Sequence, residues 1–200
     1  MPVMGMWWHT QSNQHIPTVY IAGDASSYEM EFYEVIRTRR SIRSYKADPV
    51  PETSLRRVLE AARMAPSGSN RQPWKFYVVK DPEKKRRVVQ TCGGQTWINQ
   101  APVVIVATGW KVPSNRGGYI GDMSFIMDLS IAFTHLILAA RAEGLGTCWI
   151  GAFQNTEVKK ILGLLDDENV VAVTPLGYPD KGGFTESTSR KPLEEIVEEA

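Results

Sequence analysis

Apolar residues recur along this chain with two spacings, one typical of helices and one typical of short buried strands. In the segment 52–64 they stand at i, i+3, i+4 and i+7, which predicts a helix with a single apolar face. Short apolar runs bounded by turn-forming residues, such as Phe76–Val79, predict buried strands instead. The whole pattern predicts helices at 26–39, 52–64, 82–91 and 122–143 and from Asn155, and strands at 76–79, 102–107, 147–150 and 170–174.

The ends of several elements carry local signals. Ser26 and Glu29 have the spacing of a capping box ahead of the first helix, and Asp81 followed by Pro82 fits the start of the third. Gly144 ends the longest helix, which is apolar nearly all round. Such a helix needs packing partners on every side, and one small domain struggles to supply them. We therefore expect a homodimer in which this helix is central.

Helices outnumber strands, and the strands are short and rich in β-branched residues, so we expect an α+β fold with one central sheet. The 200 residues are the length of one ordinary domain, which we assign to residues 29–200. Residues 1–28 show no periodicity and are expected to form an arm or a disordered tail. Asp128 and His135 interrupt the apolar run Met123–Ala140, which favours a buried helix over a membrane span.

Charge is balanced overall but unevenly spread. The chain has 23 Lys and Arg against 22 Asp and Glu, and fifteen of the basic residues lie between Arg37 and Arg87. This clustering indicates a local anionic ligand and keeps a nucleic-acid binder without redox activity as an alternative. The near-zero net charge, and the absence of aromatic residues among Lys84–Arg87 on a solvated helix, weigh against nucleic acid. We expect no nucleic-acid partner and no membrane.

Several common catalytic arrangements are missing from the sequence. Cys92 and Cys148 are far apart and neither belongs to a C-x-x-C pair, which disfavours a disulfide framework or a zinc ribbon and favours a reducing compartment. The three histidines have no metal-ligand spacing, and no G-x-S-x-G motif is present. We therefore expect no metal and no nucleophile–histidine–acid set, in a cytoplasmic protein without a secretory leader.

Three polar segments remain as candidates for a binding site. An extended backbone at Arg39–Arg43 puts Arg39, Ser41 and Arg43 on one side, roughly 6 to 7 Å apart, which suits a phosphate and an electron-rich carbonyl edge. The alternative is a solvated helix end, where the helix dipole favours cations anyway. The loop Pro66–Trp74 is either a plain connection or a rigid set of donors and acceptors for a flat heterocycle. Ser189–Leu193 either folds back beside Arg39 or forms an exposed basic patch.

Four runs, in this order and spacing, resemble the nitroreductase/flavin reductase family. They are Arg39–Tyr45, Ala65–Trp74, Gly144–Gly151 and Arg190–Ile196, and the resemblance covers roughly residues 30–198. It implies a nitroreductase-like fold with a central mixed, mostly antiparallel sheet surrounded by helices, in an intertwined homodimer with two FMN sites at the subunit interface.

The resemblance also implies roles for individual residues. Arg39 and Arg190 would hold the FMN phosphate, Arg40 and Ser41 would help at the phosphate and ribityl end, and Arg43 would face the pyrimidine edge. Ser67, Ser69 and Asn70 would reach the flavin from the partner subunit. The flavin's isoalloxazine edge near N5 would lie against the backbone of Cys148, Trp149, Ile150 and Gly151.

The implied activity is that of an FMN-dependent NAD(P)H oxidoreductase. NADH or NADPH would donate hydride, and a nitroaromatic, a quinone or another electron-poor small molecule would accept it in ping-pong turnover. No side chain needs to act as a catalytic acid or base; a fixed guanidinium at Arg43 would stabilise the negative charge of reduced flavin. The walls of the pocket are expected from the loop Trp110–Tyr119 and from the start of the long helix near Phe125.

Two other readings of a flavin site stay open. Halotyrosine dehalogenases share the Ala65–Gly68 run and hold an amino acid with a Glu, Tyr and Lys set on a lid between the first two strands. Here the corresponding stretch, 83–100, has no tyrosine and reads Trp97-Ile98-Asn99 where a lysine is wanted. This disfavours a flavin-dependent reductive dehalogenase of an aromatic substrate. A flavin-binding protein without turnover is the other alternative.

Overall fold

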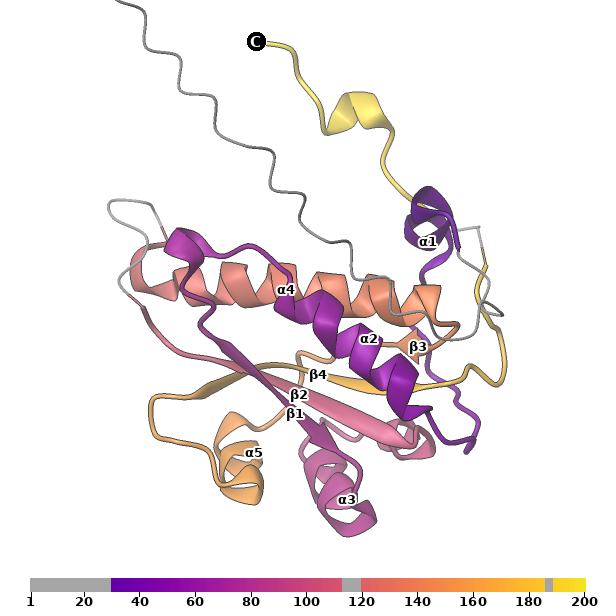
Figure 1. The fold of residues 1–200 in the computed structure, drawn as a ribbon, viewed down its shortest axis with the longest axis vertical. Coiled ribbons are helices and arrows are strands. Elements are labelled where there is room, and N and C mark those ends of the chain that lie inside the picture. The colour runs from indigo at the N-terminus through magenta and orange to yellow at the C-terminus, as the bar shows by residue number, and fades with distance from the viewer. Residues whose placement is uncertain (1–29, 113–119, 186–188) are drawn as a thin grey trace, which may run out of the picture.

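The computed structural model describes residues 30–112, 120–185 and 189–200, and its helices cover both faces of one sheet (Figure 1). The strands are β1 (Trp74–Val79), β2 (Val103–Gly109), β3 (Gly146–Thr147) and β4 (Asn169–Gly177). The helices are α1 (Phe32–Thr38), α2 (Glu52–Arg63), α3 (Pro82–Gln90), α4 (Ser124–Ala142) and α5 (Asn155–Leu162). The expected arm 1–28 and the residues Ser26 and Glu29 lie outside the described residues. The first helix is predicted to begin at the Ser26–Glu29 capping box, but α1 begins at Phe32, where the Glu31 side chain caps it by accepting from Glu34 N at 3.1 Å.

The four strands form a single sheet in the order β1-β2-β4-β3, and each neighbouring pair is antiparallel. The expected α+β class with one central sheet is therefore confirmed. The expectation of a mixed sheet is wrong for the named strands. Among the described residues the parallel component is one isolated bridge, between Ser41 and Thr147.

The strand expected at 147–150 is much shorter than its apolar, β-branched sequence predicts. The backbone N–H of Cys148 donates to Thr174 Oγ1 at 3.1 Å, so this residue leaves the ladder after Thr147. Ile150 returns to the sheet through an isolated bridge with Val173. The other predicted strands, and helices α2 to α4, begin and end within about three residues of the expected bounds, and α5 begins at Asn155 as expected.

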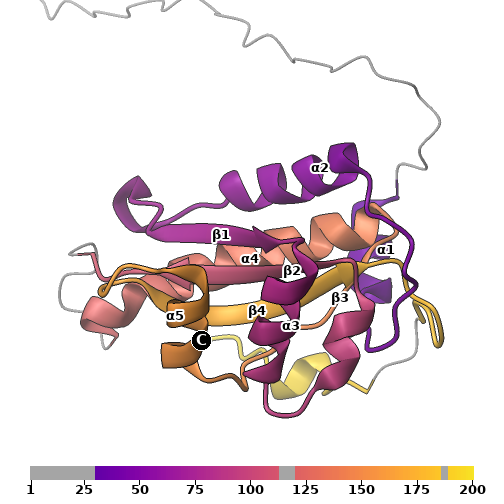
Figure 2. The ribbon, with the colours of Figure 1, turned by 90° about the horizontal axis from the view of Figure 1, so that it is seen from below.

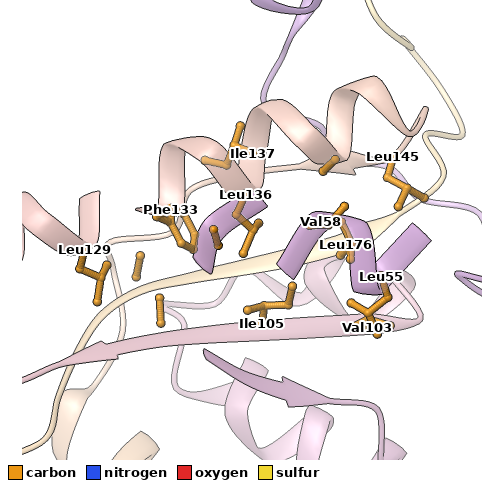
Figure 3. Close-up of a cluster of buried hydrophobic side chains, with 14 residues drawn as sticks. Leu55, Val58, Val103, Ile105, Leu129, Phe133, Leu136, Ile137, Leu145 and Leu176 are labelled. Carbon is orange, nitrogen blue, oxygen red and sulfur yellow. The ribbon is translucent and has the colours of Figure 1, made fainter. Parts of the chain in front are cut away.

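Two layers of hydrophobic side chains separate the sheet from its helices. Helices α2 and α4 cover one face and α3 and α5 the other (Figures 1 and 2). On the first face Leu55 and Val58 of α2 lie near Leu136 of α4, above Ile105 of β2 (Figure 3). The apolar face predicted for α2 is thus buried, and the removal of these side chains from water stabilises the layered arrangement.

Helix α4 lies along the sheet with one face buried and another face that no described residue covers. Leu129, Phe133 and Leu136 are fully buried, whereas Met127 and Ile131 are exposed. By length and composition alone the stretch Gly121–Ala142 is apolar enough to cross a membrane, but about half of its most apolar window is buried inside the structure. It therefore packs as a core helix, as its interrupted sequence predicts, and its exposed apolar side requires another explanation.

Candidate functional site

The segment Arg39–Arg43 runs extended beside β3 as soon as α1 ends. Ile42 N donates to Thr147 O at 2.9 Å, and Ser41 forms its parallel bridge with the same residue. Ile42 is buried against Gly146, where an added Cβ atom would lie 2.8 Å from Ile42 Cγ1. This close approach therefore requires glycine. It holds Ile42 inward and leaves its two neighbours in the chain exposed on the other side.

Two arginines, Arg40 and Arg190, lie within electrostatic reach of Arg39. The pKa of Arg39 is lowered from its ordinary value first by burial and then by the positive charges of Arg190 and Arg40. Arginine side chains carry a positive charge in proteins. We call Arg39, Arg40 and Arg190 the cationic cluster; it forms where the C-terminal segment passes α1 (Figure 1). Like charges this close repel, and an anion bound between them would offset the repulsion.

One nitrogen of Arg40 is buried without a hydrogen-bond acceptor. Its Nη1 donates to Arg37 O at 2.9 Å and Arg39 O at 2.6 Å, and its Nε donates to Thr185 Oγ1 at 3.3 Å. No acceptor for Nη2 lies among the described residues. An unsatisfied buried donor costs about 1–3 kcal/mol, and anionic oxygens are the strongest acceptors for a guanidinium. The cationic cluster therefore fits a phosphate group.

Cys148 lies beside the same segment. Burial raises the pKa of its thiol above the ordinary value, while the charge of Arg43, a hydrogen bond from Ser41 and the charge of Arg39 oppose this shift. The thiol therefore stays neutral near pH 7 and does not add a negative charge to the cationic cluster. Arg43 Nη1 donates to Ser41 O at 3.4 Å, and the Arg43 side chain is exposed. Its guanidinium is available to a ligand that also contacts Ser41.

The residues after Cys148 alternate between buried and exposed positions. Ile150 is buried and its backbone pairs with Val173, while Trp149 and Gly151 are exposed. The Trp149 ring meets the Phe133 ring edge-on, with 4.5 Å between centroids. The exposed indole of Trp149 and the exposed backbone of Gly151 follow directly after Cys148 and offer an apolar surface with accessible N–H and C=O groups.

The loop between α2 and β1 is fixed by its own hydrogen bonds. Ser67 Oγ accepts from Gln72 N at 2.9 Å, and Gln72 Nε2 donates to Asn70 O at 3.0 Å. Ser69, Asn70 and Gln72 all have a φ near +50°, a conformation that side-chain-bearing residues seldom adopt. These internal hydrogen bonds are consistent with the rigid loop that the sequence predicts.

Helix α4 holds this loop and the cationic cluster at different positions along its length. Gly68 N donates to Asp128 Oδ1 at 2.9 Å, and near the other end Arg141 Nε donates to Thr38 Oγ1 at 2.9 Å. Asp128 and Arg141 are separated by about 20 Å along the helix axis. Figure 1 shows the loop near the start of α4 and α1 near its end. One chain therefore brings together Arg39, Arg40, Ser41, Arg43, Cys148 and Arg190, but leaves Ser67, Ser69 and Asn70 elsewhere.

The expected pocket walls are only partly supported. The Phe125 side chain itself is 3% exposed and packs so closely on Gly109 that a Cβ atom there would lie 2.8 Å from its ring, so within one chain it faces the core. Trp110 lines a small cavity of about 190 Å³ together with Lys75 and Leu165, at another part of the sheet. Residues 113–119 of the expected wall lie outside the described residues.

Sequence reasoning missed two buried charged residues of α4, Asp128 and Arg141. Asp128 binds the Gly68 amide with one carboxylate oxygen, and the other oxygen is buried without a partner among the described residues. Arg141 contacts both segments that supply the cationic cluster. In the sequence, each of the two is a charged residue inside an otherwise apolar helix. Such a residue indicates a specific polar contact, but the sequence does not show which group it contacts.

Comparison with known families identifies the class to which this site belongs. The model of the nitroreductase family matches residues 36–111 and 88–178, which together span all the strands and most of the helices described above. The chain therefore belongs to the nitroreductase family of flavin oxidoreductases. The resemblance found in the four sequence runs is confirmed.

Relatives and a solved structure show the range of this likeness. An NADH dehydrogenase of Thermus thermophilus is 33% identical over 193 residues, covering 80% of this chain and 91% of that protein. Iodotyrosine deiodinase 1 of Rattus norvegicus is 28% identical over 222 residues, covering 94% of this chain and 76% of that protein. A structure from Exiguobacterium sibiricum, solved in complex with FMN, has a TM-score of 0.74 at 23% identity and covers 86% of this chain and 98% of that one. It shares the fold.

Proposed function

We propose that the protein is an FMN-dependent NAD(P)H oxidoreductase that reduces nitroaromatics, quinones or similar electron-poor small molecules. The observation that supports this most directly is the cationic cluster, in which a buried Nη2 of Arg40 has no acceptor among the described residues. A phosphate-bearing flavin satisfies that donor and offsets the repulsion between the three guanidinium groups. The relative named NADH dehydrogenase suggests a nicotinamide as the electron donor.

The chain's own residues would orient FMN along one line. Arg39, Arg40 and Arg190 would bind the phosphate, and Ser41 would contact the phosphate and ribityl end. The exposed Arg43 would contact the ring system further along the extended segment. FMN, when bound, supplies hydride transfer between the nicotinamide and the acceptor. Arg43 places a fixed positive charge where negative charge develops, and the neutral Cys148 thiol keeps an opposing negative charge out of the site.

A homodimer would complete this site. The exposed apolar residues of the described chain include Phe32, Tyr33 and Ile36 on α1 and Met127 and Ile131 on α4. The C-terminal segment, residues 189–200, is exposed throughout and extends away from the body of the fold in Figure 1. Burying these surfaces against a second copy stabilises the pair and places the partner's loop, with its Ser67, Ser69 and Asn70, near the flavin.

The test begins with the colour of the purified protein. We expect the absorbance spectrum of bound FMN, and bleaching of that spectrum when NADH or NADPH is added without oxygen. Addition of a nitroaromatic or a quinone should restore the colour. Arg40→Ala should lose most of its FMN, whereas Arg86→Ala, which removes an exposed arginine paired with Glu83 on α3, should keep it. A colourless protein that does not take up FMN would refute the proposal.

Reductive dehalogenation is the second candidate, because several relatives are named iodotyrosine deiodinase and one covers 94% of this chain. The stretch that would need to hold an amino acid, 83–100, instead forms α3 and a short 3-10 turn (Thr96–Gln100) packed on the core. Trp97 stacks on Tyr45 with 6.4 Å between ring centroids, and Ile98 is fully buried. We therefore expect the reduced protein to release little iodide from iodotyrosine while a quinone is consumed. Rapid iodide release would reverse this order.

Failure of turnover would identify the remaining alternative. If FMN is bound but neither nicotinamide bleaches it, the protein is a flavin-binding protein without this activity. Steady-state oxidation of NADH or NADPH with a quinone separates the two cases, because an enzyme consumes many equivalents per flavin and a storage protein does not.

A further inference from the structure

Arg141 is a buried cation that contacts two other segments of the chain. It lies in the last turn of α4 and is only 7% exposed. Burial lowers the pKa of its guanidinium, and the nearby charge of Glu34 opposes this shift. Burying a guanidinium is unfavourable for folding, so its presence in the apolar helix α4 calls for a specific role.

The contacts of Arg141 reach both chain segments that build the cationic cluster. Its Nε donates to Thr38 Oγ1 at 2.9 Å, and Thr38 directly precedes Arg39 and Arg40. The centre of its guanidinium lies 3.9 Å from the centroid of the Phe184 ring. Phe184 directly precedes Thr185, whose hydroxyl accepts from Arg40.

We propose that Arg141 is a positioning residue that holds the end of α1 and the Phe184–Thr185 segment together, so that Arg40 and Arg190 stand beside Arg39 around a phosphate. This rests on the proposed function, because it assigns the phosphate of FMN to the cationic cluster. Arg141 acts through other residues: Thr38 fixes the start of the Arg39–Arg43 segment, and Phe184 fixes the neighbouring Thr185, which accepts from Arg40.

The proposed role makes the effect of Arg141 specific for the phosphate end of the ligand. Arg141→Met should weaken FMN binding by roughly tenfold or more, the loss expected when one charge-assisted hydrogen bond is misplaced. Binding of riboflavin, which has the same ring and ribityl chain without the phosphate, should change little. Both affinities are measured by quenching of flavin fluorescence in a titration of the flavin-free protein.

Two further variants separate positioning from charge. Phe184→Leu leaves every arginine in place and removes the ring under Arg141, so it should also weaken FMN selectively. Arg57→Met is the matched control, because Arg57 pairs with Glu143 at 2.5 Å on the exposed side of the same helix end and contributes nothing to the cationic cluster. It should bind FMN normally. If Phe184→Leu also bound FMN normally, the positioning role would be wrong.

Hydrogen exchange gives a readout that does not depend on flavin. In the flavin-free protein, Arg141→Met should exchange faster than the unmodified chain in peptides containing residues 38–43 and 184–185, and as slowly as before in β2. Unchanged exchange in the first two regions, or an equal loss of riboflavin and FMN binding, would overturn the role of Arg141. Failure of the unmodified protein to bind FMN would instead refute the proposed function, so the two failures are distinguishable.

Discussion

At the scale of single residues, two arginines of one extended segment are expected to have different tasks. Arg39 belongs to the cationic cluster, whereas Arg43 is exposed beside Ser41 further along the segment. Arg43→Ala should lower the reduction potential of bound FMN by roughly 30–60 mV, the equivalent of losing about 1.5–3 kcal/mol of interaction with the reduced state. Arg39→Ala should mainly weaken FMN binding. Dye-equilibrated redox titrations and binding titrations measure both; equal potential shifts in the two variants would contradict this division.

Gly146 is expected to be as important for the site as the arginines themselves. A Cβ atom there would lie 2.8 Å from Ile42 Cγ1, so Gly146→Ala should push the Arg39–Arg43 segment away from β3. Overpacking of this kind costs about 1–3 kcal/mol, visible as a lower midpoint in urea and as weaker FMN binding. Gly151→Ala is the control, since nothing lies within 4 Å of the added carbon, and it should remain as stable as the parent. A fully stable Gly146→Ala would show that the segment adapts.

The sequence predicts which residues belong to the site better than it predicts how they are held. The alternation at Arg39–Arg43 places one side chain inward and its neighbours outward, and the structure has Ile42 buried between exposed residues. The contact between Ile42 and Gly146, in contrast, joins positions about one hundred residues apart, and no local pattern reports it. The same is true of Arg141, because Thr38 and Phe184 meet it only in the folded chain.

At the scale of elements, residue propensities and the spacing of apolar residues predicted most helices and strands. They failed where a side chain replaces a backbone hydrogen bond of the sheet. Helix α2 begins and ends close to its predicted bounds because its apolar residues fall on one face and its ends are marked by Pro51 and the Ala65–Gly68 turn. The strand near 147–150 is shortened because Thr174 takes the amide of Cys148. Thr174 belongs to β4, a strand later in the chain, so the residues around 147–150 alone do not predict this hydrogen bond.

Helix α4 supplies the element-scale prediction. Its residues Met127 and Ile131 are exposed in the single chain, and in the proposed homodimer they would be buried between the two copies. Ile131→Asp should therefore separate the dimer into monomers and reduce FMN content, because a buried carboxylate is costly. Light scattering coupled to size exclusion measures the mass. Leu165→Lys, at an exposed apolar residue beside the Trp110 cavity, is the control and should stay dimeric.

An Ile131→Asp protein that remained a dimer would place the interface elsewhere on the surface. A parent protein that is a monomer with full FMN would contradict the shared site altogether. In the first case, the dimer interface lies on another surface of the protein. In the second case, one chain binds the flavin with only the residues around the cationic cluster.

At the scale of the whole molecule, the fold separates groups that the proposed function needs together. Asp128 binds the Ser67 loop near one end of α4, and Arg141 holds the Arg39 segment near the other, about 20 Å away. In the proposed homodimer, the flavin would take the cationic cluster from one chain and the loop from the other. The exposed apolar residues of α4 and the exposed C-terminal segment would then lie at the contact between the two copies.

Mixed dimers test that arrangement directly. Arg39→Ala and Ser67→Ala dimers should each bind FMN weakly at both sites. When two differently tagged chains, one with each change, are coexpressed and the mixed dimer is isolated, one site receives both changes and the other receives neither. We therefore expect one tight FMN per mixed dimer, measured by titration and by recovery of about half the NAD(P)H-dependent activity of the parent. A site built within a single chain would leave one change in each site, and the mixed dimer would then bind FMN no better than its parents.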